Sequence, residues 1–73
     1  MPRVSSLYPE YKISDLDTGG ATEYFGFVDG RGGWYILKLT ATEARYAKGR
    51  DDYTTNWTNR ATTVTYGRFD EVF

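Results

Sequence analysis

The most constraining feature of this sequence is a glycine-rich turn between two aromatic segments. Asp29-Gly30-Arg31-Gly32-Gly33 separates the run Glu23–Val28 from the run Trp34–Thr40. An Asp-Gly pair between two such runs is typical of a β-hairpin, because glycine adopts a positive φ without steric cost. We therefore expect a fold built on antiparallel strands joined by short turns.

The alternation of side chains assigns the residues of these two strands to faces. In the run 23–28, Phe25 and Phe27 share one face, and Gly26 on the other face indicates either a bulge or the close approach of a neighbour. The run 34–40 carries large apolar side chains on both faces, which indicates a central strand covered on both sides. In the run 34–40, one face carries Tyr35, Leu37 and Leu39, and the other carries Trp34, Ile36 and Lys38.

Three further segments have strand-like patterns. Tyr11–Leu16 is the first strand candidate and is followed by the turn Thr18-Gly19-Gly20. Glu43–Ala47 is ambiguous, and we favour a strand over a helix, ended by Lys48-Gly49. In that strand Tyr46 would point inward, and Glu43 and Arg45 outward. Thr62–Tyr66 is rich in β-branched residues and predicts a fifth strand.

The segment before the fifth strand predicts a helical turn. Tyr53, Trp57 and Ala61 are four residues apart and would share one helical face, with Asp52 as the N-cap. Phe69, Val72 and Phe73 form an apolar tail. The predicted fold class is mainly all-β: a small antiparallel meander or barrel-like sheet of four to five strands, with one short helical turn near residues 53–60. Residues 1–9 read as an N-terminal arm, and residues 10–73 as a single small β domain.

The residue types that are missing exclude several kinds of chemistry. The 73 residues contain neither Cys nor His, which excludes disulfides, zinc sites built on Cys or His, and catalytic sets that need either residue. The acidic pair Asp15 and Asp17 is better explained as solvated or Arg-paired carboxylates than as a metal or glycosidase site. We expect no catalytic, cofactor or metal site, and no enzymatic activity.

Charge and hydropathy argue against nucleic acid and membranes as partners. The net charge is -1, which gives no excess of positive charge for binding phosphate backbones. The longest apolar run is Trp34-Tyr35-Ile36-Leu37, which is too short for a signal peptide or a membrane span. We expect a soluble chain that is synthesised in the cytoplasm.

A chain of this length has difficulty burying enough apolar surface, and this one has no disulfide or zinc site to help. Aromatic residues make up 18% of the chain, and they favour either unusually efficient packing or burial against another chain. A monomeric mini-barrel is the alternative to an oligomer. The same aromatic groups would also suit the stacking of sugar rings. The candidate interface and binding residues are Tyr24, Trp34, Tyr35, Arg45, Trp57, Arg60, Phe69 and Phe73.

Several short motifs carry a resemblance to known proteins. Gly33-Trp34-Tyr35-Ile36-Leu37, Arg45-Tyr46-Ala47-Lys48-Gly49 and Asn56-Trp57-Thr58-Asn59-Arg60-Ala61 are the main ones, and the pattern spans residues 24–73. This pattern resembles short open reading frames of tailed bacteriophages. The resemblance implies a virion component of the tail, tail tip or fibre, or of the head surface. It also implies a trimeric or sixfold homo-oligomer in contact with other virion proteins, and no catalytic residues.

We therefore expect a non-enzymatic structural subunit that is made in the host cytoplasm and located in the virion. Two alternatives stay open. One is a host-recognition module that binds surface carbohydrate through Trp34. The other is a small phage regulatory protein that binds a host factor.

Overall fold

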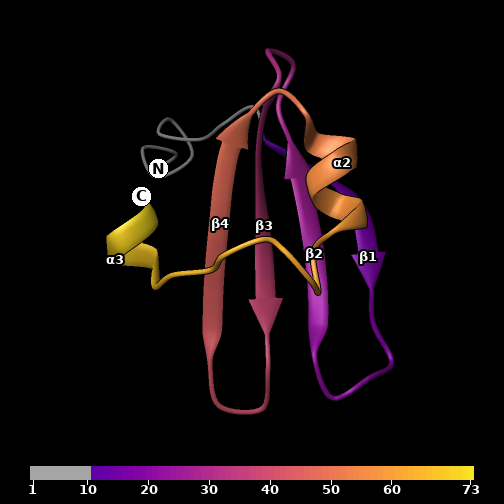
Figure 1. Cartoon of the computed structure of the whole chain (residues 1–73), viewed down its shortest axis with the longest axis vertical. Coiled ribbons are helices and arrows are strands. Elements are labelled where there is room, and N and C mark those ends of the chain that lie inside the picture. Colours follow the sequence, from indigo (N-terminus) through magenta and orange to yellow (C-terminus); the bar gives the residue numbers. More distant parts are fainter. Residues whose placement is uncertain (1–10) are drawn as a thin grey trace, which may run out of the picture.

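A computed structural model describes residues 11–73, so the arm predicted for residues 1–9 lies outside the described residues. Four strands form a single antiparallel meander in the order β1-β2-β3-β4 (Figure 1). This confirms the mainly β fold, with the sheet open rather than closed into a barrel. The strands are β1 (Lys12–Asp17), β2 (Glu23–Val28), β3 (Gly33–Leu39) and β4 (Ala44–Arg50), and they are followed by the short helices α2 (Tyr53–Thr58) and α3 (Phe69–Val72).

The β2–β3 hairpin forms where the glycine-rich turn predicts it. One carboxylate oxygen of Asp29 accepts hydrogen bonds from the backbone N–H groups of Arg31 and Gly33, both at 2.8 Å. Gly32 has a φ of +90°, a conformation that other residues adopt only with strain. The backbone bond from Arg31 is the main cause that lowers the pKa of Asp29, with help from the Gly33 bond and the nearby Arg50 and Arg31 cations.

Strand β4 runs further than the sequence predicts, through Lys48 and Gly49 to Arg50. Gly49 does not break the strand but makes room for the indole of Trp34. A Cβ at position 49 would lie 2.6 Å from Cζ2 of that ring. The indole N–H then donates to the backbone oxygen of Asp51 at 2.7 Å, which fixes the ring beneath the chain that leaves β4.

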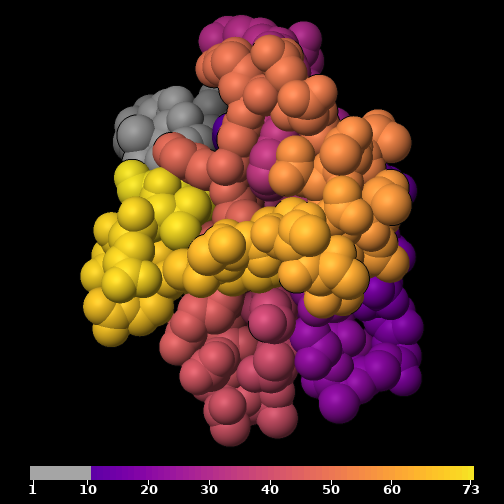
Figure 2. Space-filling model, in the orientation of Figure 1, coloured from indigo at the N-terminus to yellow at the C-terminus, as the bar shows by residue number. Residues whose placement is uncertain are grey.

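One side of the sheet, the covered face, holds the core. Its buried residues are Tyr24, Trp34, Ile36 and Ala47, with Ile36 fully buried. Helix α2 and the segment 59–67 lie across this side, in front of the sheet in Figure 1, and the space-filling view shows them as one continuous layer (Figure 2). Their half-buried side chains Tyr53, Trp57, Val64 and Tyr66 pack on the core.

Gly26 marks a close approach, which is one of the two interpretations that the sequence left open. A Cβ at this position would lie 2.9 Å from Cζ of Tyr53 and 3.0 Å from Cε3 of Trp57, so both rings of α2 rest on the bare backbone of β2. The neighbouring β1 strand has a bulge between Ile13 and Asp15, opposite Phe27 and Gly26. The bulge is therefore in β1, and the role of Gly26 is to leave room for the two rings of α2.

The predicted fifth strand over residues 62–66 is absent. The backbone N–H groups of Thr62 and Thr63 donate to the carbonyl of Asn59 at 3.0 and 3.1 Å, which makes a turn. The chain then crosses the covered face instead of running along an edge. It pairs with β4 only through an isolated bridge between Tyr46 and Gly67. The β-branched composition predicted a strand, but the segment does not pair along either edge of the sheet.

Two details of the predicted helix are also wrong. Asp52 makes no side-chain capping hydrogen bond, because Asp51 and Asp52 both have positive φ in the tight turn from β4 into α2. The backbone carbonyl of Asp52 accepts from Asn56 instead. Tyr53 and Trp57 do share a face and stack, but α2 ends at Thr58, which leaves Ala61 exposed beyond it.

Candidate functional site

The second side of the sheet, the open face, is the main candidate for function. Residues that pair across the four strands form rows on it. An end row holds Glu23, Leu39 and Ala44, and the opposite end row holds Gly33 and Arg50. The two middle rows are Leu16-Phe25-Leu37-Tyr46 and Ile13-Phe27-Tyr35-Lys48.

The open face exposes large apolar side chains. Leu16 is 62% exposed and Ile13 is 54% exposed, both on the edge strand β1. Phe25 and Leu37, which continue the row of Leu16, are only half-buried, whereas Ile36 on the covered face is fully buried. Within residues 11–73, α3 packs on the β4 side of this face, and no layer like α2 covers its β1 side. The strand β3 is thus central, as predicted, but within this range only one of its faces is fully covered.

A cluster of aromatic rings occupies the β3–β4 side of the open face. Phe27 stacks on Tyr35 with ring centroids 4.5 Å apart. Phe73 approaches Tyr35 and Tyr46 edge-on at 5.3 and 5.7 Å, and Phe69 of α3 does the same to Tyr46 at 5.4 Å. Burial is the main cause that raises the pKa of Tyr35, so its phenol stays neutral at ordinary pH. The predicted apolar tail therefore extends this face as the short helix α3.

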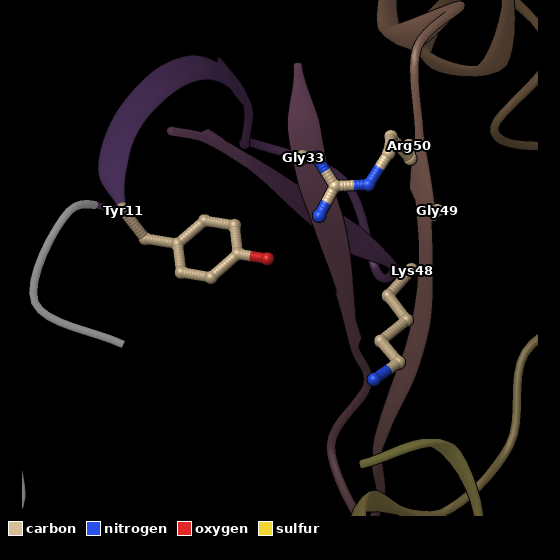
Figure 3. A pocket seen from close by; sticks show the side chains of 5 residues that line it. All are labelled: Tyr11, Gly33, Lys48, Gly49 and Arg50. Carbon is tan, nitrogen blue, oxygen red and sulfur yellow. The ribbon is translucent and has the colours of Figure 1, made fainter. Parts of the chain in front are cut away.

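A shallow pocket of about 310 Å³ opens at the end of the open face that carries Arg50. The ring of Tyr11, which packs edge-on against Tyr35 at 5.0 Å, reaches across it toward Lys48 and Arg50 on β4 (Figure 3). Gly33 and Gly49 supply the rest of the lining. Lys48 and Arg50 line this pocket, and the carboxylate of Asp29 lies beside Gly33 at the same end, so this end of the face carries both signs of charge.

The predicted site residues are divided between the two faces and do not form one site. Tyr24 and Trp34 are buried in the core, and Trp57 and Arg60 lie in the layer above it. Tyr35, Phe69 and Phe73 belong to the aromatic cluster of the open face or its border. Arg45 lies opposite Lys38 in β3 and forms an ion pair with Glu43 at 3.3 Å.

Arg60 joins the covering layer to the sheet. Its guanidinium pairs with the carboxylate of Asp17 at 2.9 Å, donates to the carbonyl of Trp57 at 2.7 Å, and lies 4.3 Å from the Trp57 ring centre. In parallel, the hydroxyl of Tyr53 donates to Asp15 at 2.7 Å. The pKa of Tyr53 is raised, mainly by burial and next by the hydrogen bond to Asp15. Asp15 and Asp17 therefore hold α2 in place.

Sequence reasoning missed the residues that most clearly define the open face, namely Ile13, Leu16, Phe27, Tyr46 and Lys48. The alternation of β2 and β3 places Phe25, Phe27, Tyr35 and Leu37 on matching faces once their register is known. However, nothing in the pattern says which face α2 would cover. The bulge in β1 also shifts Ile13 and Leu16 onto one face although they are three residues apart.

Comparison of the chain with protein-family models, with curated proteins and with solved structures finds no match. In residues 11–73, no acidic side chains gather closely enough to bind a metal ion. Over the same range, neither helix has the length and apolar character needed to cross a bilayer. The arrangement of the open face is therefore the main guide to function.

Proposed function

We propose that this chain is a non-enzymatic structural subunit of a tailed-phage virion, in the tail, tail tip or fibre, and that it works by burying its open face. The observation that carries this proposal is the exposure of Leu16 and Ile13 beside two rows of apolar side chains. A contiguous apolar patch of this kind marks a protein interaction site rather than a solvated surface. The resemblance of residues 24–73 to short phage reading frames supports the virion as the place of assembly.

Burying the open face would also help a chain that is short of core. Fully burying an exposed leucine side chain contributes about 2 kcal/mol, and covering the parts of Leu16 and Ile13 that are still exposed would contribute about half of this for each. Tyr35, Tyr46 and Phe73 add rigid aromatic surface, which is enriched at protein interfaces. These features support an assembly role.

A carbohydrate-binding role has weaker support. The sugar platform expected at Trp34 is only 5% exposed, because the ring lies beneath the chain that links β4 to α2. A small regulatory protein that binds a host factor would use the same open face. Presence of the chain in purified virions distinguishes a structural role from this regulatory one.

The proposal is tested by mass spectrometry of purified virions that are produced in the presence of tagged variants. We expect the wild-type chain in the particles in a fixed ratio to tail proteins, Leu16→Lys absent from them, and Ala61→Lys present. Ala61 is exposed on the covered-face side, so its substitution adds the same charge away from the open face. Absence of the wild-type chain from particles, or equal incorporation of both variants, would contradict the proposal. Circular dichroism of both variants is the control for folding, and we expect both spectra to match that of the wild-type chain.

A further inference from the structure

We propose that the Asp29-Gly30 bond is a chemical modification site that the folded hairpin protects. While the turn between β2 and β3 is closed, Asp29 stays an ordinary aspartate. When the turn opens, the residue isomerises to isoaspartate without the help of an enzyme. The proposal does not depend on which protein buries the open face.

The sequence places one reactive dipeptide at the tip of the hairpin. Asp29-Gly30 is the only Asp-Gly pair among the 73 residues, and no Asn-Gly pair is present. Backbone attack on an aspartate side chain is fastest when glycine follows, because glycine has no Cβ to hinder the approach of its nitrogen. Gly30 is exposed, and the turn projects beyond the ends of β2 and β3 at the top of Figure 1. Water therefore has access to the bond.

The reaction needs only the chain and water. The backbone nitrogen of Gly30 attacks Cγ of Asp29 and loses its proton, and one carboxyl oxygen leaves as water, which closes a five-membered succinimide. A water molecule then opens the ring. Attack at Cγ restores aspartate, whereas attack at the main-chain carbonyl carbon leaves isoaspartate, with the peptide chain running through the side-chain carboxyl. One water is released and one is consumed, so the mass does not change.

The folded turn holds the Asp29 carboxyl group away from this reaction. Its Oδ1 accepts hydrogen bonds from the backbone N–H groups of Arg31 and Gly33, both at 2.8 Å. Its Oδ2 lies against Gly33, where a Cβ would be only 2.6 Å from this oxygen. Presenting Cγ to the nitrogen of Gly30 requires the carboxyl group to rotate and to lose both bonds. The N–H groups also favour the ionised carboxylate, which is a poorer electrophile than the acid.

Opening the turn requires breaking contacts on both of its sides. The backbone N–H of Asp29 donates to the carbonyl of Gly33 at 2.9 Å, and the N–H of Asp51, beyond the end of β4, donates to the carbonyl of Gly32 at 2.7 Å. The rate of modification therefore follows the fraction of molecules in which the hairpin is open. Isoaspartate adds a methylene to the main chain within the turn, so a chain modified while it is open does not re-form the same hydrogen bonds.

The first test incubates the wild-type chain at neutral pH and physiological temperature, in buffer and in guanidinium chloride. Isoaspartate at position 29 is quantified by peptide mapping with electron-transfer fragmentation, which distinguishes the two isomers. We expect accumulation in denaturant to be faster by about tenfold or more, because the native protein reacts only from its open state.

The second test compares Gly32→Ala with Gly19→Ala in buffer. Both glycines have positive φ, +90° and +100°, so both substitutions strain a turn, but only Gly32 lies in the turn of Asp29. The Asp29-Gly30 pair is intact in both variants. We expect Gly32→Ala to accelerate the modification severalfold and Gly19→Ala to react at the wild-type rate. Circular dichroism monitors folding, and if Gly32→Ala does not fold, the two wild-type incubations still decide the question.

Each outcome bears on the proposal. Faster modification in denaturant and in Gly32→Ala would support it. Equal rates of the wild-type chain in the two solvents would overturn the protection, and an unmodified chain in denaturant would overturn the site itself. Equal acceleration by both glycine variants would assign the protection to overall stability instead of the Asp29 turn. None of these results changes incorporation into virions, which tests the proposed function separately.

Discussion

At the scale of single residues, the fold depends on a position where a side chain is missing. Gly26 lets the rings of Tyr53 and Trp57 rest directly on β2, so the helix lies closer to the sheet than any side chain would allow. Overpacking at such a site costs about 1–3 kcal/mol, because neither ring can move without opening the core.

We therefore expect Gly26→Ala to lower the free energy of unfolding by about 1–3 kcal/mol in urea titrations. Gly30→Ala is the matched control, because nothing lies within 4 Å of a Cβ at that position. It should change the free energy by less than about 0.5 kcal/mol. Equal effects of the two substitutions would show that the packing of α2 on β2 does not depend on the missing side chain at Gly26.

Asp29 gives the hairpin a pH dependence. Its folded-state pKa is lowered, chiefly by the backbone N–H of Arg31, from an ordinary value of 3.8. Stability from this carboxylate is therefore present above about pH 4 and is lost as the pH falls through the lower folded-state pKa. We expect Asp29→Asn, which keeps an acceptor oxygen, to lose less melting temperature between about pH 5 and pH 2 than the wild type. An identical acid profile of the two proteins would contradict this role.

At the scale of secondary-structure elements, α2 and the segment after it are held to β1 by polar contacts. The Arg60–Asp17 ion pair is the strongest of these contacts, because two guanidinium nitrogens contact one carboxylate oxygen, the pair is half-buried, and the guanidinium stacks on Trp57. Such pairs contribute more than exposed ones, although partial exposure screens them.

Asp17→Asn is expected to destabilise the protein by about 1 kcal/mol in urea titrations, because Arg60 loses its charged partner. Glu43→Gln is the matched control, since the Glu43–Arg45 pair is more exposed and holds no element in place. It should cost less than about 0.5 kcal/mol. A control as costly as Asp17→Asn would argue against a special role of the Arg60 contact.

The elements that the sequence predicts well are those specified by local chemistry. β2 has the predicted bounds, and β3 begins and ends within one residue of them, because the turn at Asp29 and the aromatic alternation act over short distances. Residues 62–66 were mispredicted because β propensity does not decide whether a segment pairs with an edge strand, and here the turn at Asn59 directs the chain across the covered face. The extension of β4 through Gly49 was missed because the reason is the Trp34 ring, a contact distant in sequence.

At the scale of the whole molecule, one sheet carries two apolar faces and, over residues 11–73, one covering layer. The sequence indicated that β3 has apolar groups on both sides, and it placed Tyr35 and Leu37 on the face opposite to Trp34 and Ile36. It did not show which face α2 would cover, because that depends on the direction in which the chain leaves β4 at Asp51 and Asp52. The candidate site was therefore only partly predictable.

The central claim is that another protein buries the open face in the assembled particle, and mass spectrometry of purified virions tests it most directly. We predict that Leu16→Lys is missing from the particles, because the new charge lies on the exposed apolar face, and that Ala61→Lys is incorporated like the wild-type chain. Equal incorporation of the two variants would contradict the claim.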